Sequence, residues 1–349
     1  MTDRLRRLTP SLLPVALALL VSIILLLLAG ANPFEAFELI YTGSLGSTTK
    51  LANTLLAWVP LALAAAGLVI TFQAGLWNIG VEGQIVMGAV AATWVAREIP
   101  GPAAVVIPTT LLAGVLGGLT WGLLAAALKV YGKVNEIFGG LGLDFVATGI
   151  VVYLVIGPWK RTGVASTSGT DVFRDEAWLP TVGDFSPLAI GVALAAVVGV
   201  YYLMRGTLFG LRLKAVGRNP KSAYLLGINT NRYVLIAMGL GGALAGIAGT
   251  VQATGFQHKL VPSISGGYGF LGILVVMLAA YRAVWIAPIA LFFVVISVGS
   301  TQLSMRLKLD SALGGVLQGV LVLFALLASG AHLYRTRTRN QATTVEAEG

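Results

Sequence analysis

The sequence contains no cysteine and only two histidines, His258 and His332, among its 349 residues. The lack of cysteine excludes disulfides, iron–sulfur clusters and thiol nucleophiles. Charged residues are also scarce, because they make up 11% of the chain against about 25% of an ordinary soluble domain. Since 57% of the residues are hydrophobic, the chain has more apolar surface than a water-soluble core buries, and we expect an integral membrane protein.

Motifs of enzymes are missing as well. The sequence has no phosphate-binding loop of the form G-x-x-x-x-G-K-[ST], so any dependence on ATP must come from a partner. It also lacks H-E-x-x-H, G-x-S-x-G and Cys/His metal clusters, and its two histidines offer no catalytic constellation. We therefore predict that the chain is not an enzyme and carries no metal or cofactor of its own.

Long apolar runs, rather than alternating strands of about ten residues, predict an all-α fold, because a bilayer admits only helices or closed barrels. About ten runs approach the length that a helix needs to cross the hydrocarbon layer. They lie near residues 11–30, 52–71, 82–97, 103–128, 138–156, 187–204, 233–252, 270–281, 284–303 and 312–331. The length of the first run favours an uncleaved helix over a secretory signal. The eighth and ninth runs are so close that they could form one tilted or re-entrant element.

Basic residues are concentrated on one side of the predicted membrane. With a cytoplasmic N-terminus, 15 of the 23 Lys and Arg residues lie on the cytoplasmic side. They are Arg4, Arg6, Arg7, Lys129, Lys133, Arg205, Arg212, Lys214, Arg218, Lys221, Arg232, Arg282, Arg335, Arg337 and Arg339. This bias predicts that both termini are cytoplasmic. The net charge of +9 is thus explained by basic residues on the cytoplasmic side of the membrane. We therefore expect a lipid bilayer, and no nucleic acid, as a partner.

The same topology divides the chain into regions. We expect residues 1–332 to form a single transmembrane domain, in which residues 157–186 are an external loop and residues 206–230 a cytoplasmic segment. Residues 333–349 are polar, lack apolar periodicity and are predicted to be a disordered cytoplasmic tail. Within the seventh run, Gly242-x-x-x-Gly246 predicts close helix packing.

The cytoplasmic segment 206–230 has the pattern of two short helices. Leu211, Ala215 and Val216 recur at helical spacing, Asn219-Pro220 ends one helix and caps the next, and Gly227 ends the second. One interpretation is a basic amphipathic loop that only anchors to anionic headgroups. The other is a docking surface for a cytoplasmic partner.

Two motifs resemble a known family, the permease subunits of ATP-binding-cassette (ABC) importers for simple sugars, nucleosides and branched-chain amino acids. Residues 75–89 are similar to its N-I-G-x-E-G-Q hallmark, and residues 210–228 to its coupling segment. Further resemblances lie at 134–137 and 266–273, so the likeness covers roughly residues 55–330. By this likeness the positions that dock the ATPase are Gly210, Arg212, Ala215, Gly217, Asn219, Pro220, Ala223 and Gly227. Asp144 and the segment Tyr281–Trp285 depart from the family pattern.

Residues around the hallmark are candidates for the solute path. Glycines interrupt the two short apolar segments there, and such interruptions in transporters place polar groups along the path. The candidates are Phe72, Trp77, Asn78, Glu82 and Gln84. The alternative is a structural polar cluster at helix ends, with the aromatic rings as interfacial anchors. For Asp144 we favour a structural contact, with Lys133 or a neighbouring helix, over a proton relay.

The resemblance implies a permease that forms the path with a second identical or paralogous chain. Its other partners would be a cytoplasmic ABC ATPase, which binds ATP and Mg, and an extracytoplasmic solute-binding protein, and its location the cytoplasmic membrane of a bacterial-type cell. The expected solutes are nucleosides first and simple sugars next. The alternatives are an ion-coupled secondary transporter, which predicts buried acids in several spans, and a passive channel, which needs a repeated filter that the sequence lacks.

Overall fold

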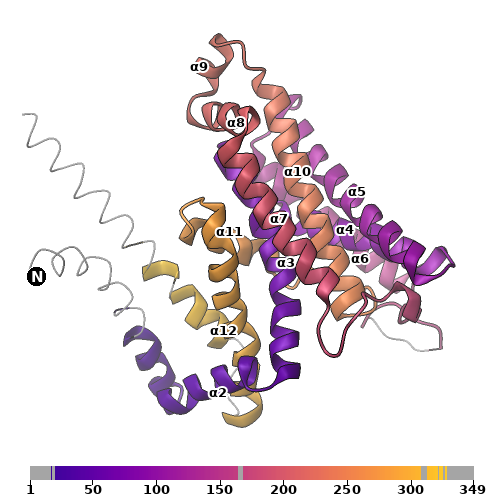
Figure 1. The fold of residues 1–349 in the computed structure, drawn as a ribbon, viewed down its shortest axis with the longest axis vertical. Coiled ribbons are helices and arrows are strands. Elements are labelled where there is room, and N and C mark those ends of the chain that lie inside the picture. Colours follow the sequence, from indigo (N-terminus) through magenta and orange to yellow (C-terminus); the bar gives the residue numbers. More distant parts are fainter. Residues whose placement is uncertain are drawn as a thin grey trace, which may run out of the picture. The chain divides into compact units, whose positions relative to one another are not determined.

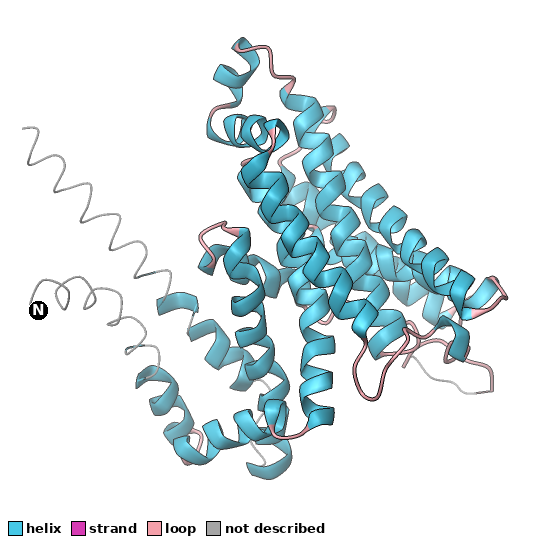
Figure 2. Cartoon of the chain, viewed as in Figure 1, coloured by secondary structure: helices cyan, strands magenta, loops and turns pink. Residues whose placement is uncertain are grey.

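The computed structural model describes residues 17, 20–163, 168–307, 313–320, 322–324 and 327. Figure 2 shows that the described chain consists of helices and loops, and Figure 1 labels the helices. They are α2 (Pro33–Leu45), α3 (Thr48–Gln73), α4 (Val81–Glu98), α5 (Ala103–Val130), α6 (Glu136–Ile156), η1 (Asp175–Ala177), α7 (Pro187–Gly206), α8 (Leu208–Arg218), α9 (Pro220–Leu225), α10 (Thr230–Val251), η2 (Gln252–Phe256), α11 (Tyr268–Leu278), η3 (Ala283–Trp285) and α12 (Ile286–Leu307). The chain divides into two compact units, residues 51–294 and residues 1–50 with 295–349. The all-α prediction is confirmed for the described residues.

Helix α3 is the buried helix of the unit formed by residues 51–294. In its most apolar stretch 83% of the residues are buried, and every residue from Leu61 to Ala66 has no exposed surface. A helix that is apolar all round needs neighbours on all sides. Residues of α10 and α11 contact it directly, since a Cβ added at Gly67 or Gly272 would lie within 3.4 Å of the other helix.

Glycines allow α10 to pack against α4 and α5 at backbone distance. A Cβ added at Gly246 would lie 2.0 Å from the carbonyl oxygen of Gly114 in α5. One added at Gly249 would lie 2.0 Å from the carbonyl oxygen of Ile85 in α4. The close packing predicted from Gly242-x-x-x-Gly246 is therefore confirmed. Such contacts hold helices together in a bilayer, where lipid is as apolar as the side chains.

The unit formed by residues 1–50 and 295–349 begins, in its described part, with the helical stretch Leu20–Leu28. A sharp bend follows, in which Gly30 has a φ of +80° and Asn32 caps α2. The stretch and α2 meet at an angle of 103°. The predicted first run ignored this second helix, so a single straight span over 11–30 is an incomplete description of the region. Residues 11–16 lie outside the described residues.

A small apolar core joins the elements of this unit. Leu26, Ala36, Ile40, Leu303 and Leu317 form one buried cluster. The C-terminal part of α12 approaches α2 closely there, because a Cβ added at Gly299 would lie 2.2 Å from the carbonyl oxygen of Ile40. This core holds α2, which at 13 residues is too short to span a bilayer alone.

Among the described residues, six helices are long and apolar enough to cross a membrane, or up to seven if the bent pair forms one span. The six are α3, α5, α6, α7, α10 with η2, and α12 with η3. Helix α4 carries Glu82, Arg97 and Glu98, and α11 and Leu313–Phe324 are shorter apolar helices. The multi-pass helical architecture is confirmed, and the count of ten spans stays a prediction.

The eighth and ninth predicted runs are separate helices. Helix α11 ends at Leu278 and α12 begins at Ile286. Between them Ala280 and Tyr281 have φ values of +49° and +60°, which no continuous helix contains. At about 1.5 Å per residue α11 is only about 16 Å long, roughly half of the hydrocarbon thickness. The eighth element is therefore a half-helix.

The segment 157–186 packs on the C-terminal end of the α10–η2 helix and on the residues that follow it. The backbone N–H groups of Thr170, Phe173 and Leu179 donate to the carbonyls of Leu260, His258 and Thr254 at 2.9, 2.8 and 3.2 Å. The Trp178 ring stacks on His258 with centroids 4.0 Å apart. Its residues 164–167, like the predicted tail 333–349 and Arg4, Arg6 and Arg7, lie outside the described residues. The predicted loop is therefore an ordered cover in its described part.

Candidate solute path and coupling segment

Residues 74–80 connect α3 to α4 without helical structure. Gly75 has a φ of +75°, and a Cβ added there would lie 3.0 Å from the carbonyl oxygen of Gly217 in α8. Gly80 precedes α4, and a Cβ there would lie 2.8 Å from the Cα of Gly140 in α6. Glycine is therefore required at both ends of this connection. Gly75 is required by its left-handed backbone and by the close approach of α8, and Gly80 by the close approach of α6. The glycines of the hallmark thus bring the connection into backbone contact with α8 and α6.

Asn78 and Gln84 form a closed pair of amides. Nδ2 of Asn78 donates to Oε1 of Gln84 at 3.1 Å, and Nε2 of Gln84 donates to Oδ1 of Asn78 at 3.0 Å. The two side chains are buried, with 1% and 0% of their surface exposed. Since burying an unpaired amide costs about 1–3 kcal/mol, the reciprocal pairing stabilises this connection. It joins residue 78 of the non-helical run to the first turn of α4.

Glu82 joins the start of α4 to the start of α11. Its Oε2 accepts a hydrogen bond of 2.7 Å from the backbone N–H of Gly269. The N–H groups of Gly267 and Phe270 and the Ser265 hydroxyl also act on this carboxylate. These groups include the free N–H groups of a helix N-terminus, where a carboxylate is favoured. Glu82 therefore caps a helix that begins almost two hundred residues later in the chain.

Asp144 of α6 lies beside this junction. It is 8% exposed, and its Cα would lie 3.0 Å from a Cβ added at Gly83. Its carboxylate is close enough to that of Glu82 for the two to repel each other. Its Oδ1 has no hydrogen-bond partner among the described residues. Helix α6 therefore packs on α4 at Asp144, but the predicted polar pairing of its carboxylate stays a prediction, and Lys133 donates instead to the carbonyl of Val130 at 3.0 Å.

The junction lies about halfway along α10, level with the last two turns of α3. A Cβ added at Gly241 of α10 would lie 3.6 Å from Nδ2 of Asn78. The α10–η2 helix has 27 residues, so Gly241 lies about 16 Å along the axis from Thr230 and about 22 Å from Phe256 at 1.5 Å per residue. Helix α4 and the half-helix α11 therefore both begin near the middle of α10. This is the arrangement by which transporters place helix ends and polar groups at the midplane.

The two aromatic candidates lie elsewhere, at the end of α3. The rings of Phe72 and Trp77 are 5.3 Å apart, and Tyr281 adds an edge-on contact to Phe72 at 5.9 Å. Trp77 is 42% exposed, unlike the amide pair. The five predicted path residues thus separate into an aromatic group at the bundle end and a buried polar group that comprises Asn78, Glu82 and Gln84.

The coupling segment consists of two short helices, as predicted. The Thr207 side chain caps α8, and Asn219 caps α9 by accepting from the N–H of Ser222 at 3.1 Å. Gly227, with a φ of +78°, follows the end of α9. Because Pro220 at the first position of α9 lacks an N–H, it interrupts the helical hydrogen bonding there.

One face of this segment is seated on the helix bundle. A Cβ added at Gly210 would lie 2.5 Å from the carbonyl oxygen of Leu203 at the end of α7. A Cβ added at Gly217 would lie 2.2 Å from the carbonyl oxygen of Gln73 at the end of α3. Ala223 is buried, and Ala215 is half-buried. These small residues allow the segment to lie directly on backbone.

The other face of the segment is exposed and in part apolar. Arg212, Asn219, Pro220 and Gly227 are exposed. Large apolar side chains are exposed with them, namely Leu208, Leu211, Tyr224, Leu225 and Leu226, at 65–85% of their surface. Sequence reasoning missed this apolar tip, because a Tyr-Leu-Leu run in a short helix is also the pattern of a buried face. Exposed apolar clusters of this kind mark interaction sites.

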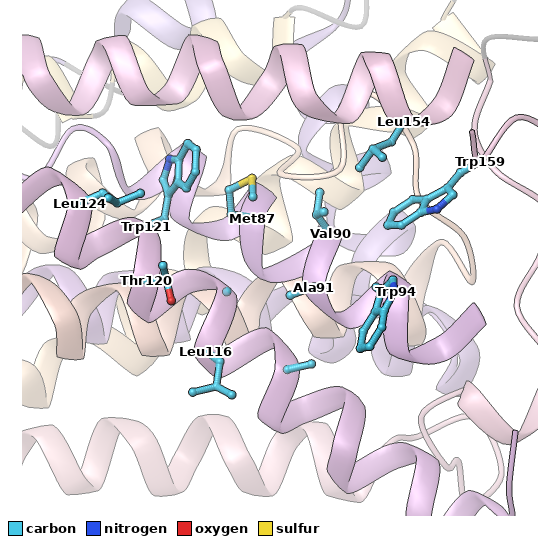
Figure 3. Close-up of a pocket in the computed structure, with 12 residues that line it drawn as sticks. Met87, Val90, Ala91, Trp94, Leu116, Thr120, Trp121, Leu124, Leu154 and Trp159 are labelled. Atoms are coloured by element: carbon cyan, nitrogen blue, oxygen red, sulfur yellow. The ribbon is translucent and has the colours of Figure 1, made fainter. Parts of the chain in front are cut away.

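An open groove of about 600 Å³ lies between α4, α5 and α6 (Figure 3). Its wall is mostly apolar, with Met87 on one side and with Trp94 and Trp159 together at one end (Figure 3). Thr120 contributes a hydroxyl, and the indole N–H of Trp121 donates to the carbonyl of Leu143 at 3.3 Å. A groove of this composition fits apolar chains better than a polar solute, so we do not place the solute path in it.

Comparison with known proteins agrees with this geometry. The family model described as branched-chain amino acid transport system / permease component matches residues 50–326. The glucose ABC transporter permease protein TsgB13 of Haloferax volcanii is 32% identical, with 93% of this chain and 88% of that protein covered. The guanosine ABC transporter permease protein NupP of Bacillus subtilis is 26% identical, with 93% and 94% covered. The nucleoside ABC transporter permease protein NupB of Lactococcus lactis is 27% identical, with 86% and 85% covered.

The match extends over the described helices from α3 to α12 and over both motifs. Membership of the family implies partnership with an ATPase and a solute-binding protein. The chain therefore belongs to this permease family, as a transport component of an ABC importer and not as an enzyme.

Proposed function

We propose that this chain conducts a small polar solute, a nucleoside in the first place and a simple sugar in the second. Relatives named for guanosine and nucleosides support the first choice, and the relative named for glucose supports the second. The exposed Trp77 and the half-buried Phe72 beside it offer aromatic faces on which nucleobases and sugar rings stack. Solute selectivity would rest mainly with the external binding protein.

The observation that carries the coupling role is the two-faced α8–α9 segment. Its buried face lies on the backbone at the ends of α3 and α7, and its exposed face carries Leu225 and Leu226 at 85% and 78% exposure beside Arg212. Figure 1 shows both helices at the end of the bundle formed by α7 and α10. A partner that binds this face would move α8 together with the ends of two helices. We assign it to the ABC ATPase, which binds ATP and Mg.

The buried polar group has a different role in this proposal. The amide groups of Asn78 and Gln84 hydrogen-bond to each other, and the Glu82 carboxylate accepts a hydrogen bond from the N-terminus of α11. These residues fix how α4 and α11 begin and do not bind the solute. Phe72 and Trp77 stay the candidates for the path.

We propose the full arrangement by the family likeness. Two permease chains, identical or paralogous, form the path in the cytoplasmic membrane of a bacterial-type cell, with both termini in the cytoplasm. The six long helices, the bent pair, α4, α11 and Leu313–Phe324 would supply the ten spanning elements. The external loop 157–186 would face the solute-binding protein. An ion-coupled transporter is the weaker alternative, since among the described residues only Glu82 and Asp144 are buried acids.

Co-purification tests the proposal. The tagged chain is isolated in mild detergent from cells of its source, its partners are identified by mass spectrometry, and the eluate is assayed for ATP hydrolysis. We expect an ABC ATPase whose activity rises with a binding protein and, after reconstitution, ATP-driven uptake of guanosine in preference to glucose. Arg212→Glu should reduce the recovery of the ATPase while leaving membrane insertion unchanged. A chain recovered alone that transports under an ion gradient would refute the proposal.

A further inference from the structure

A basic cleft of about 440 Å³ lies where α7 ends, beside α8 and the turn between α11 and α12. Each of these three elements contributes one cation to it, namely Arg205, Lys214 and Arg282. The wall also includes the aromatic rings of Tyr201 and Trp285. The aromatic and basic groups therefore surround one space that is built from distant parts of the chain.

The positive charge of this cleft has no counter-charge in its wall. The lining residues include no Asp or Glu, and the sequence holds none between Asp184 and Asp310. The ion pairs Lys129–Glu136 and Arg161–Asp171 involve no cation of the cleft. Lys214 donates to the carbonyl of Met204 at 2.5 Å, which neutralises nothing. Three like charges in one cleft repel each other, so the site favours an anion.

The turn that forms one wall is held in a strained conformation. Ala280 and Tyr281 both have left-handed backbone, at φ of +49° and +60°, which costs of order 1 kcal/mol or more for each residue that is not glycine. Nε2 of Gln73 donates to the carbonyl of Tyr281 at 2.8 Å and helps to hold the turn. The residues from Tyr281 to Trp285 then line the cleft consecutively. Strain of this kind persists where the surrounding structure fixes it, often at a site of function.

The exposed face of α7, the helix that ends at the cleft, is suited to lipid chains. Leu194, Val198 and Tyr202 follow each other at intervals of four residues on α7 and are 46%, 51% and 65% exposed. Trp285, which lines the cleft, is 52% exposed. Tryptophan and tyrosine concentrate at the level of the headgroups, and basic pockets between spanning helices bind anionic headgroups. A phosphate at this position can have its acyl chains along α7.

We propose that this cleft binds the phosphate group of an anionic phospholipid, with Arg205, Lys214 and Arg282 as its ligands. Because Lys214 belongs to α8, a bound headgroup ties the coupling segment to the α11–α12 turn through charge-assisted contacts. The site does not depend on the identity of the transported solute, and its occupancy can be measured without transport.

Native mass spectrometry of the delipidated full-length chain in mild detergent tests the site, with phosphatidylglycerol and phosphatidylcholine as probes. We expect one phosphatidylglycerol to be retained and phosphatidylcholine not to be. Arg282→Gln should weaken the binding about tenfold, as loss of one charge-assisted contact predicts, whereas Arg282→Lys should retain most of it. Lys221→Gln is the matched control, since Lys221 is an exposed cation of α9 outside the cleft. Equal binding by wild type and Arg282→Gln would overturn the proposal.

A second readout tests where the lipid lies. Phosphatidylglycerol with brominated acyl chains should quench the fluorescence of Trp285, and the quenched component should be absent from Trp285→Phe. Quenching that is the same in both proteins would refute the assignment. Displacement of the lipid by equal concentrations of soluble glycerol phosphate would show a site for free phosphate instead. Displacement by the purified ATPase would show that acidic groups of that partner occupy the cleft, and either result would overturn the lipid proposal.

Discussion

The contact between Gly217 and the end of α3 allows a sharp test of the coupling segment. In Gly217→Ala the new Cβ would lie 2.2 Å from the carbonyl oxygen of Gln73 and 2.9 Å from the carbonyl carbon of Ala74. Since ordinary contact begins near 3.4 Å, α8 or the end of α3 must move by about 1 Å. Forcing a methyl group into a packed contact costs about 1–3 kcal/mol.

Alanine also favours the helix itself, by up to about 1 kcal/mol over glycine, which offsets part of this cost. A net loss of about 1–2 kcal/mol in the seating of α8 corresponds to a factor of about 5 to 30. Gly206→Ala is the matched control, because a Cβ at Gly206 would have no atom within 4 Å. It changes helix propensity at the end of α7 without disturbing a contact.

The assay is the number of solute molecules transported per ATP hydrolysed, in vesicles that hold the chain with its ATPase and its binding protein. We expect this ratio to fall about tenfold in Gly217→Ala, with ATP hydrolysis retained and with Gly206→Ala like wild type. The larger change Gly217→Trp should abolish coupling without preventing insertion. A Gly217→Ala protein with wild-type transport per ATP would show that the contact between α8 and α3 does not couple ATP hydrolysis to transport.

Three further predictions concern stability. Glu82→Gln keeps an oxygen that accepts from Gly269, so its melting temperature should stay within a few degrees of wild type, whereas Glu82→Ala leaves the N-terminus of α11 unpaired and should lose about 1–3 kcal/mol. Burial lowers the pKa of His258 from its ordinary value of 6.5. Between the folded and the unfolded pKa the folded state therefore binds fewer protons than the unfolded state, and the stability of the fold rises with pH. Acidification below about 6.5 should loosen the packing of residues 157–186 on the end of the α10–η2 helix. Hydrogen exchange at pH 7.5 and 5.5 measures this, and His258→Gln should remove the difference. Gly246→Ala should fail to fold stably or unfold at much lower temperature, while Gly199→Ala, with open space around the Cβ, should not.

Local signals explain why the coupling segment could be predicted from the sequence. Thr207 and Asn219 supply side-chain caps, Pro220 fixes the first turn of α9, and Gly227 takes the left-handed backbone that ends it. Each of these signals acts within four residues of its position. Helix periodicity and capping therefore determine this part of the fold largely without tertiary contacts.

For the polar group of Asn78, Glu82 and Gln84, the sequence could predict which residues belong to it but not what they contact. The sequence shows that Glu82 stands alone among apolar residues, but its partner Gly269 lies 187 positions away. No periodic pattern connects the two positions. The half-length of α11 was equally hidden, because an apolar run of eleven residues and a longer span differ only in where the backbone turns, here at Ala280 and Tyr281. Helix α2 was missed because its 13 residues are fewer than the roughly 20 that predict a span.

A single stretch of the chain links the coupling segment to the centre of the bundle. Gly75 contacts Gly217 of α8 at one end of residues 74–80, and Asn78 lies beside Gly241, halfway along α10, near the other. The Asn78–Gln84 pair holds this stretch to the first turn of α4, from which Glu82 reaches the start of α11. If the ATPase docks on α8 as proposed, a displacement of α8 is connected through the backbone of residues 74–80 and the hydrogen bonds of Asn78 and Glu82 to the starts of α4 and α11. If the connection acts as one body, Gly217→Ala should increase hydrogen exchange at the N-terminus of α11 as well as at α8, and unchanged exchange at α11 would locate the coupling in α7 alone.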